Sequence, residues 1–138
     1  MKARLLIVDD EEDFLDIMAE RMEARGMDVT TTTSAENALK MVQTESYDAV
    51  IIDFLMPEMD GFTALKMFKA SRPDLSVILL TANVPDEKCL EAIQLGAMDV
   101  IEKPADINLL AQKIEEAKAL KDKHSIPSPA PQRVTRTP

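Results

Sequence analysis

Short apolar runs alternate with longer amphipathic segments along the first 120 residues of the chain. Residues Arg4–Val8, Ala49–Ile52 and Ser76–Leu80 each contain four consecutive apolar residues, a pattern typical of strands that are buried on both faces. Asp28–Thr32 is β-branched but polar, and Asp99–Glu102 is short. We therefore predict that these two runs form the edge strands of a sheet.

The segments between the apolar runs keep helical spacing, and each has its own start or stop signal. Thr33 and Glu36 form a capping box for the second predicted helix. The fourth helix is bounded by Pro85 and Gly96, and Asp106 caps the fifth. Strand and helix thus alternate five times. This alternation predicts an α/β fold with a parallel sheet covered on both faces.

The composition changes after about Leu120. The segment 121–138 holds half of the eight prolines and few large apolar residues, so we predict a domain at 1–120 and a disordered tail or linker at 121–138. The net charge of the chain is −9, and residues 119–138 carry +3, which leaves −12 on the domain. Such acidity disfavours binding to nucleic acid or anionic membranes.

Two further sequence features bear on location and ligands. The chain has one cysteine, and its first apolar run stops at Asp9, which is too short for a signal peptide or a membrane span. We therefore expect a cytoplasmic protein. Neither of the glycine-rich phosphate-binding motifs occurs among its three glycines, so a nucleotide site is not expected.

Polar residues stand where the predicted strands end, and in an open parallel sheet these ends form the binding site. The first run ends in Asp9-Asp10, the third in Asp53, the fourth in Thr81 and the fifth in Lys103. Three carboxylates in one place repel one another and favour a hard divalent cation such as Mg²⁺. A lysine and a hydroxyl suit phosphoryl oxygens. Taken together, the set predicts phosphoryl transfer to a carboxylate nucleophile.

Each of these residues also has a simpler interpretation when it is taken alone. The run Asp9–Asp13 fits an acidic helix N-terminus, Thr81 fits a turn, and Lys103 fits an exposed surface position. Their joint placement at the ends of successive strands favours the functional interpretation.

The motifs "DDEE", "DFLMPEMDG", "TA" and "EKP" resemble the receiver domain of two-component response regulators over residues 3–120. The resemblance implies a flavodoxin-like (βα)₅ fold with strand order 2-1-3-4-5. It also implies that Asp53 accepts the phosphoryl group, while Asp9, Asp10, Asp53 and the backbone carbonyl of Leu55 bind Mg²⁺. Thr81 and Lys103 would contact the phosphoryl group, and the Lys103–Pro104 peptide would be cis.

Four residues are implied to modulate this activity. Leu55 and Asn83 flank the approach of water and tune the phosphoryl lifetime, and Ala82 follows the threonine in the "TA" motif. Val100 departs from the family pattern, which often has Tyr or Phe three residues before the lysine. A valine cannot swing between buried and exposed positions as an aromatic ring does.

The resemblance implies a signalling module rather than an enzyme, with autophosphorylation and autodephosphorylation as its own reactions. Its partners would be a sensor histidine kinase or phosphotransfer protein and a downstream protein or fused output domain. It would be a monomer or a phosphorylation-dependent homodimer. Two alternatives remain open. One is a degenerate receiver that only binds, and the other is an aspartyl phosphohydrolase, against which Leu55 counts because a second acid is usual there.

Overall fold

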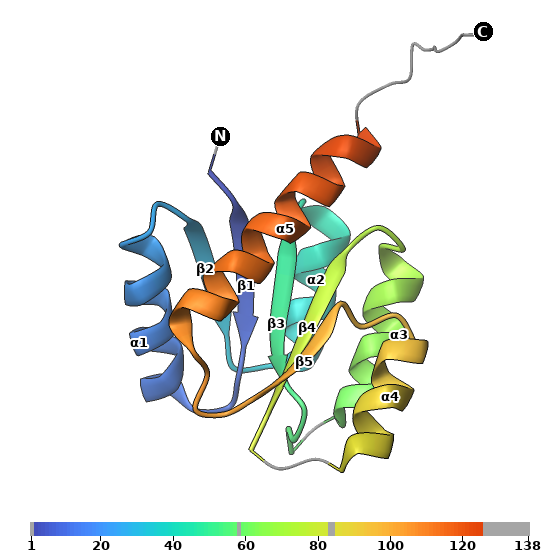
Figure 1. The fold of residues 1–138 in the computed structure, drawn as a ribbon. Helices are drawn as coiled ribbons and strands as arrows, with labels where there is room; N and C mark the ends of the chain where they lie inside the picture. Colours follow the sequence, from blue (N-terminus) through green and yellow to red (C-terminus); the bar gives the residue numbers. More distant parts are fainter. Residues whose placement is uncertain (1, 58, 83–84, 126–138) are drawn as a thin grey trace, which may run out of the picture.

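The computed structural model describes residues 2–57, 59–82 and 85–125, the last three by their backbone. Strands and helices alternate along the described chain (Figure 1). The strands are β1 Arg4–Val8, β2 Asp28–Thr32, β3 Ala49–Asp53, β4 Ser76–Thr81 and β5 Asp99–Glu102. The helices are α1 Glu12–Glu23, α2 Ala35–Thr44, α3 Gly61–Ser71, α4 Asp86–Gln94 and α5 Ile107–Ser125.

The five strands form one parallel sheet in the order β2-β1-β3-β4-β5, which confirms the predicted flavodoxin-like fold. The chain crosses from β1 outward to β2 and then returns to place β3 on the other side of β1. In such sheets ligands bind at this reversal, beyond the carboxyl ends of the strands. Val8 pairs with Ile52, so the residues that follow them, Asp9 and Asp53, lie side by side at the carboxyl ends of β1 and β3.

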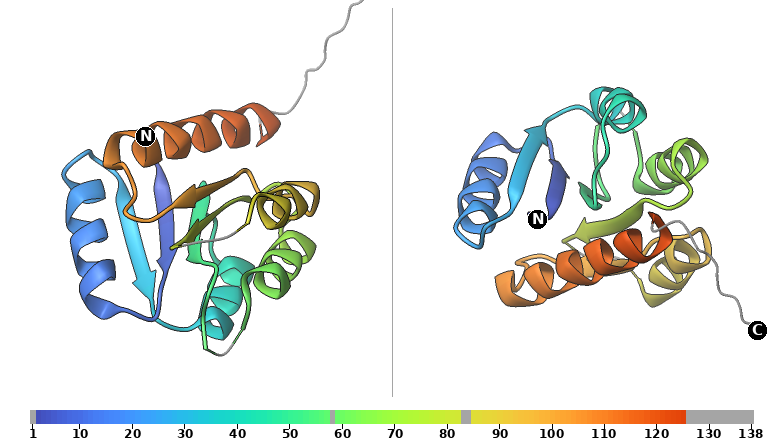
Figure 2. Two further views of the ribbon diagram at one scale, coloured as in Figure 1. Left: turned by 60° about the horizontal axis from the view of Figure 1, so that its bottom comes forward. Right: turned by 90° about the horizontal axis from the view of Figure 1, so that it is seen from above.

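The helices cover the two faces of the sheet in unequal layers (Figure 2). Successive side chains of a strand point to opposite faces, so each apolar run contributes to two separate cores. One core lies against α2, α3 and α4, and the other lies against α1 and α5. The central strands supply Leu6, Val8, Val50 and Ile52 to the first core, and Leu5, Ile7, Ala49 and Ile51 to the second.

Two helix boundaries differ from those expected from the sequence. The N-cap of α2 is Ser34, whose hydroxyl accepts from the Asn37 N–H at 3.1 Å, so the predicted capping box at Thr33 is one residue out of place. Helix α5 continues to Ser125, past the boundary predicted near Leu120, because Lys121 donates to the carbonyl of Tyr47 at 2.9 Å and anchors the helix. Residues 126–138 of the predicted tail lie outside the described residues.

The start of α3 is fixed by Asp60, and this cap leads to a prediction about stability. Its carboxylate accepts from the Thr63 N–H at 2.9 Å, and this bond holds the pKa of Asp60 below its usual value. We expect Asp60→Ala to lower the free energy of unfolding by about 1 kcal/mol at neutral pH. Because the folded pKa is depressed, the charge-dependent part of this contribution is complete above pH 3.8 and disappears as pH falls through the folded value.

Urea denaturation at several pH values measures this difference. Asp60→Asn is the matched control, because its side chain keeps an oxygen acceptor while losing the charge. A cap contribution that stayed constant down to acidic pH would contradict the assignment of the effect to the ionised carboxylate.

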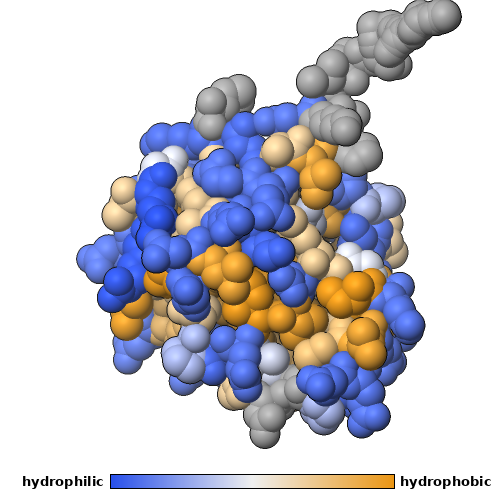
Figure 3. Space-filling view, in the orientation of Figure 1, coloured by the Kyte–Doolittle hydropathy of each residue, from blue (hydrophilic) through white to orange (hydrophobic). Residues whose placement is uncertain are grey.

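The surface mixes hydrophilic side chains with apolar ones, which gather on the lower half of the face shown in Figure 3. This is the region in which Figure 1 shows β5 and α4. Helix α4 exposes Leu90 and Ile93, by 64% and 45%. Within the described ranges, no helix combines the length and apolar character that crossing a membrane requires.

Candidate functional site

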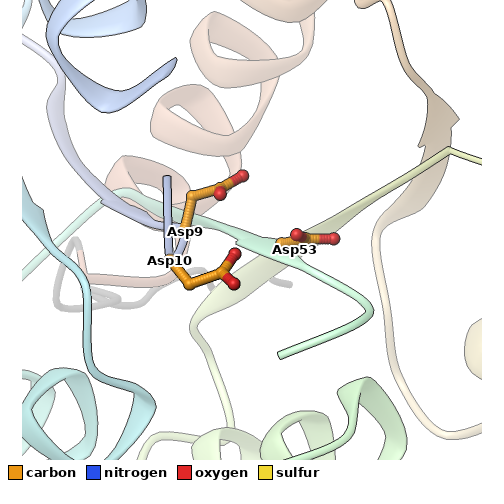
Figure 4. Close-up of side chains that lie close together, drawn as sticks. All are labelled: Asp9, Asp10 and Asp53. Atoms are coloured by element: carbon orange, nitrogen blue, oxygen red, sulfur yellow. The ribbon is translucent and has the colours of Figure 1, made fainter. Parts of the chain in front are cut away.

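Three carboxylates converge at the carboxyl ends of β1 and β3 (Figure 4). Asp9 and Asp10 follow β1, and Asp53 is the last residue of β3. One oxygen from each carboxylate lies within 4.8 Å of the others. Asp9 is completely buried, Asp53 is 9% exposed and Asp10 is open to solvent. The sheet register therefore assembles the acidic cluster that the strand ends predicted.

Lys103 follows β5 and places its ammonium group among these carboxylates. Its Nζ lies 2.8 Å from Asp9 Oδ2 and 3.6 Å from Asp53 Oδ2. The side chain is only 17% exposed, so water screens these charges little. The Lys103–Pro104 peptide is cis, as the resemblance implied.

The loops that follow the strands orient the two buried carboxylates. The Glu11 N–H donates to Asp9 Oδ1 at 2.9 Å, and the Leu55 N–H donates to Asp53 Oδ1 at 3.1 Å. Each bond joins an aspartate to the amide two residues on, which is the usual geometry of an Asx turn. The β3–α3 loop closes where the Gly61 N–H donates to the Phe54 carbonyl at 2.8 Å. Glycine is required there because a Cβ would collide with the Phe54 ring.

Thr81 lies at the carboxyl end of β4, the strand next to the one that carries Asp53. It is the last residue of β4, it is buried, and its carbonyl accepts from the Lys103 N–H at 2.7 Å. Within the described part of the chain its hydroxyl oxygen has no hydrogen-bond partner. This buried hydroxyl is therefore available to an oxygen that arrives at the site.

Three of the four residues predicted to modulate the site lie in the described part of the chain. Leu55 is 61% exposed and Ala82 is exposed, so both face solvent beside the strand ends. Val100 lies inside β5, pairs with Leu79 and packs, partly buried, against the core beneath α2, α3 and α4. Asn83 lies outside the described residues.

The electrostatics of the site raise the pKa of Asp53 above its ordinary value. Burial is the main cause, and the neighbouring charges of Asp9 and Asp10 act in the same direction. The Leu55 N–H and Lys103 oppose this rise but do not cancel it. Burial alone would lower the pKa of Lys103, whereas its hydrogen bond and charge contact with Asp9 raise it overall. Lys103 is thus held as a cation within the acidic cluster.

The donor set fits a hard divalent cation. Asp9, Asp10 and Asp53 offer oxygen ligands, and one lysine does not balance three carboxylates. Oxygen ligands and a partly open site match the preference of Mg²⁺, which retains several of its waters. The cluster therefore has the composition of a metal-binding site.

The raised pKa of Asp53 leads to a prediction for Asp53→Asn. A folded-state pKa above 3.8 means that ionisation of Asp53 opposes folding at neutral pH. The substitution removes this charge and keeps the oxygen that accepts from Leu55. In the presence of a chelator at pH 7 we expect the variant to be more stable by about 1 kcal/mol.

Urea denaturation tests this expectation. The penalty is absent below pH 3.8 and develops as pH rises through the folded pKa, so the advantage of the variant is expected to shrink on acidification. A variant less stable than the wild type at pH 7 would show that the charge is better compensated than these contacts indicate.

Comparisons with known proteins agree with this arrangement. Residues 5–115 match the family described as the response regulator receiver domain. Response regulator SaeR of Staphylococcus epidermidis is 42% identical over 100 residues, which are 72% of this chain and 43% of that protein. The chain therefore spans less than half the length of this curated relative.

Solved structures show the same fold. A response regulator receiver domain protein from Clostridium thermocellum superposes with a TM-score of 0.83 and 29% identity, covering 88% of this chain and 98% of that one. The Francisella response regulator 1452 receiver domain gives a TM-score of 0.81 at 27% identity, covering 87% and 99%. This chain has a five-stranded parallel sheet with acidic residues at its strand ends. The chain belongs to the receiver domains of two-component response regulators, which are generally signalling rather than catalytic domains.

Two contacts of Lys103 were not anticipated from the sequence. Its Nζ lies 3.9 Å from Glu11 Oε1 and 4.3 Å from the centroid of the Phe14 ring. Glu11 belongs to an acidic run that also suits a helix start, and Phe14 has the spacing of a core residue. Neither pattern indicates a contact with a residue that lies about ninety positions further along the chain.

Proposed function

We propose that Asp53 accepts a phosphoryl group from the phosphohistidine of a sensor kinase or phosphotransfer protein. A carboxylate oxygen of Asp53 attacks phosphorus, the phosphorus–nitrogen bond breaks, and the imidazole leaves and takes up a proton. Asp53 suits this role because its carboxylate is shielded, with only 9% of its surface exposed, and lies 3.6 Å from the Lys103 ammonium group. Its hydrogen bond to the Leu55 N–H fixes the direction of one oxygen.

The observation that carries this proposal is the position of the Lys103 ammonium between two buried carboxylates. It lies 2.8 Å from Asp9 and 3.6 Å from Asp53, which supports a role in offsetting the negative charge of the phosphoryl oxygens. Thr81 adds a buried hydroxyl at the neighbouring strand end. In this proposal Lys103 supplies charge compensation and Thr81 supplies a hydrogen bond.

We assign Mg²⁺ binding to Asp9, Asp10, Asp53 and the backbone carbonyl of Leu55. When bound, Mg²⁺ supplies positive charge that offsets the phosphoryl oxygens and the carboxylates. Residues of the chain hold the side chains of the site in position. Asp9 holds Lys103 at 2.8 Å, and the Glu11 N–H holds Asp9 at 2.9 Å.

The response regulator family implies a histidine kinase partner and an output domain or protein. We propose that phosphorylation changes the affinity of the surface formed by α4, β5 and α5. Leu90 and Ile93 on α4 and Leu109 on α5 are exposed there by 64%, 45% and 38%. Because Val100 replaces the usual aromatic residue of β5, movement of the β4–α4 region is expected to carry the signal. Leu55, Ala82 and Asn83 are assigned to tuning the phosphoryl lifetime.

Intact-mass measurement with Mg²⁺ and acetyl phosphate tests the proposal. We expect the wild type to gain one phosphoryl group that persists for minutes, and Asp53→Asn to gain none. Failure of the wild type to form any adduct would favour a degenerate receiver that only binds. Rapid multiple turnover of phosphate esters would favour a phosphohydrolase. Loss of the adduct in the variant with retained folding would assign the acceptor to Asp53.

A further inference from the structure

A groove of about 460 Å³ lies beside the carboxylate cluster, where the β3–α3 loop meets the N-terminal turns of α3 and α4. We call it the α3–α4 groove. The views of Figures 1 and 2 agree that α3 and α4 run side by side there. Its lining consists of Phe54, Leu55, Asp60, Phe62, Thr63, Lys66, Pro85 and Lys88.

One wall of the groove is apolar. The Phe54 and Phe62 rings meet edge to face, with centroids 5.0 Å apart and an interplanar angle of 84°. Leu55 stands beside them with 61% of its surface exposed. An aromatic pair with a neighbouring exposed leucine is a typical anchor point for one inserted side chain.

Among the described residues, the lining carries two positive charges and one negative charge. Lys66 and Lys88 are exposed, and the Lys88 Nζ lies 5.4 Å from the centroid of the Phe62 ring. The acid of the lining, Asp60, keeps its negative charge while it accepts from the N–H and hydroxyl of Thr63, at 2.9 and 3.2 Å, so the lining has a net charge of +1. The first 118 residues carry −12, so most of this surface repels an acidic partner. The two lysines mark a place where such a partner is attracted.

We infer that the α3–α4 groove docks an acidic segment of a protein partner, which inserts one apolar side chain against Phe54, Leu55 and Phe62 and places carboxylates at Lys66 and Lys88. A protein segment fits better than a small molecule because most of the lining residues are exposed. Small-molecule sites usually enclose most of their ligand, whereas an open groove needs the further contacts that a protein supplies.

This groove is physically connected to the acceptor. The Leu55 N–H donates to Asp53 Oδ1 at 3.1 Å, while the Leu55 side chain lines the groove. Modification of Asp53 removes or redirects this bond and shifts Leu55. This shift of Leu55 changes the affinity of the groove for its partner. By thermodynamic linkage, docking in the groove then changes the phosphorylation equilibrium by the same factor as phosphorylation changes the docking affinity. This coupling rests on the proposed function, whereas docking itself does not.

Two short peptides test the docking, N-acetyl-Glu-Phe-Glu amide and its basic counterpart N-acetyl-Lys-Phe-Lys amide. We expect ¹H–¹⁵N NMR titration of the unphosphorylated protein to shift the amides of Leu55, Phe62 and Lys88 with the acidic peptide only. Reversing both rim charges, Lys66→Glu with Lys88→Glu, is expected to weaken binding about fivefold or more. Leu55→Ser is expected to weaken it through the apolar contact.

The matched control reverses two exposed charges on other helices, Arg21→Glu with Lys40→Glu, and is expected to leave the affinity within about twofold. Equal binding of both peptides, equal weakening by the control, or the absence of shifts in the groove at millimolar peptide would overturn the docking inference.

The coupling is tested separately with acetyl phosphate and Mg²⁺, where the affinity for the acidic peptide is expected to change about fivefold on phosphorylation. An unchanged affinity in phosphorylated protein would overturn the coupling. Failure to phosphorylate would instead overturn the proposed function and leave the docking result standing.

Discussion

Replacing Lys103 by methionine is expected to slow phosphorylation by acetyl phosphate on the order of 10²- to 10³-fold at saturating Mg²⁺. The ammonium group lies 3.6 Å from the Asp53 carboxylate and is 17% exposed, so its charge acts on the incoming oxygens with little screening. Methionine has a similar length and packs against Phe14 without supplying charge. The rate of appearance of the phosphorylated mass measures the effect.

The same substitution is expected to affect stability. Asp9 is completely buried and loses its 2.8 Å partner, and leaving a buried charge uncompensated typically costs about 3 kcal/mol. Mg²⁺ should restore part of this loss. Lys40→Met, on the exposed surface of α2, is the control for loss of one positive charge. A rate for Lys103→Met within threefold of the wild type would remove Lys103 from the proposed reaction.

Removal of the divalent ion is expected to have the other large effect, since a chelator should abolish detectable phosphorylation. Asp9, Asp10 and Asp53 bring their oxygens within 4.8 Å of one another, and Lys103 compensates only part of this charge. A cation that binds the folded state alone also stabilises it, by about 2.7 kcal/mol at a hundredfold excess over Kd. Thermal unfolding at increasing MgCl₂, against NaCl of equal ionic strength, measures this gain.

Asp10→Asn tests whether the stabilisation by Mg²⁺ comes from an ion bound at the carboxylate cluster. Asp10 is exposed and is not the proposed acceptor, so the variant is expected to fold normally while the affinity for Mg²⁺ falls tenfold or more. Asp16→Asn, an exposed site on α1, is the matched control and should retain the stabilisation by Mg²⁺. Equal stabilisation of the wild type and Asp10→Asn would mean that the ion binds elsewhere.

The fold was predictable because its strands carry a strong local signal. The runs ending at Val8, Ile52 and Leu80 are apolar on both faces, and only a sheet with helices on both sides buries both sets of side chains. The meeting of Asp9 and Asp53 followed from the same reasoning, because parallel strands end at one edge. The sequence pattern therefore predicts both the strands and the residues that meet at their carboxyl ends.

The remaining features depend on contacts between distant parts of the chain. Helix α5 continues through Lys121 because that side chain reaches Tyr47, 74 positions earlier, a contact that no local pattern indicates. Phe14 lies at the site because the Lys103 side chain, which follows β5, reaches its ring, whereas the spacing of Phe14 alone suits the core. The start of α2 at Ser34 reflects competition between adjacent capping residues, which local signals resolve only to within a residue.

The placement of β3 beside β1 also has a consequence for the order in which the molecule becomes competent. Asp9 and Asp53 are separated by a complete excursion through α1, β2 and α2, and Lys103 arrives from β5 near the far end of the domain. Each member of the cluster therefore comes from a long-range pairing, the slow and cooperative part of folding. A nascent or proteolytically shortened chain that ends before β5 contains Asp9, Asp10 and Asp53 but not Lys103. Under the proposed function, binding of the ion and the phosphoryl group therefore requires the completely folded domain.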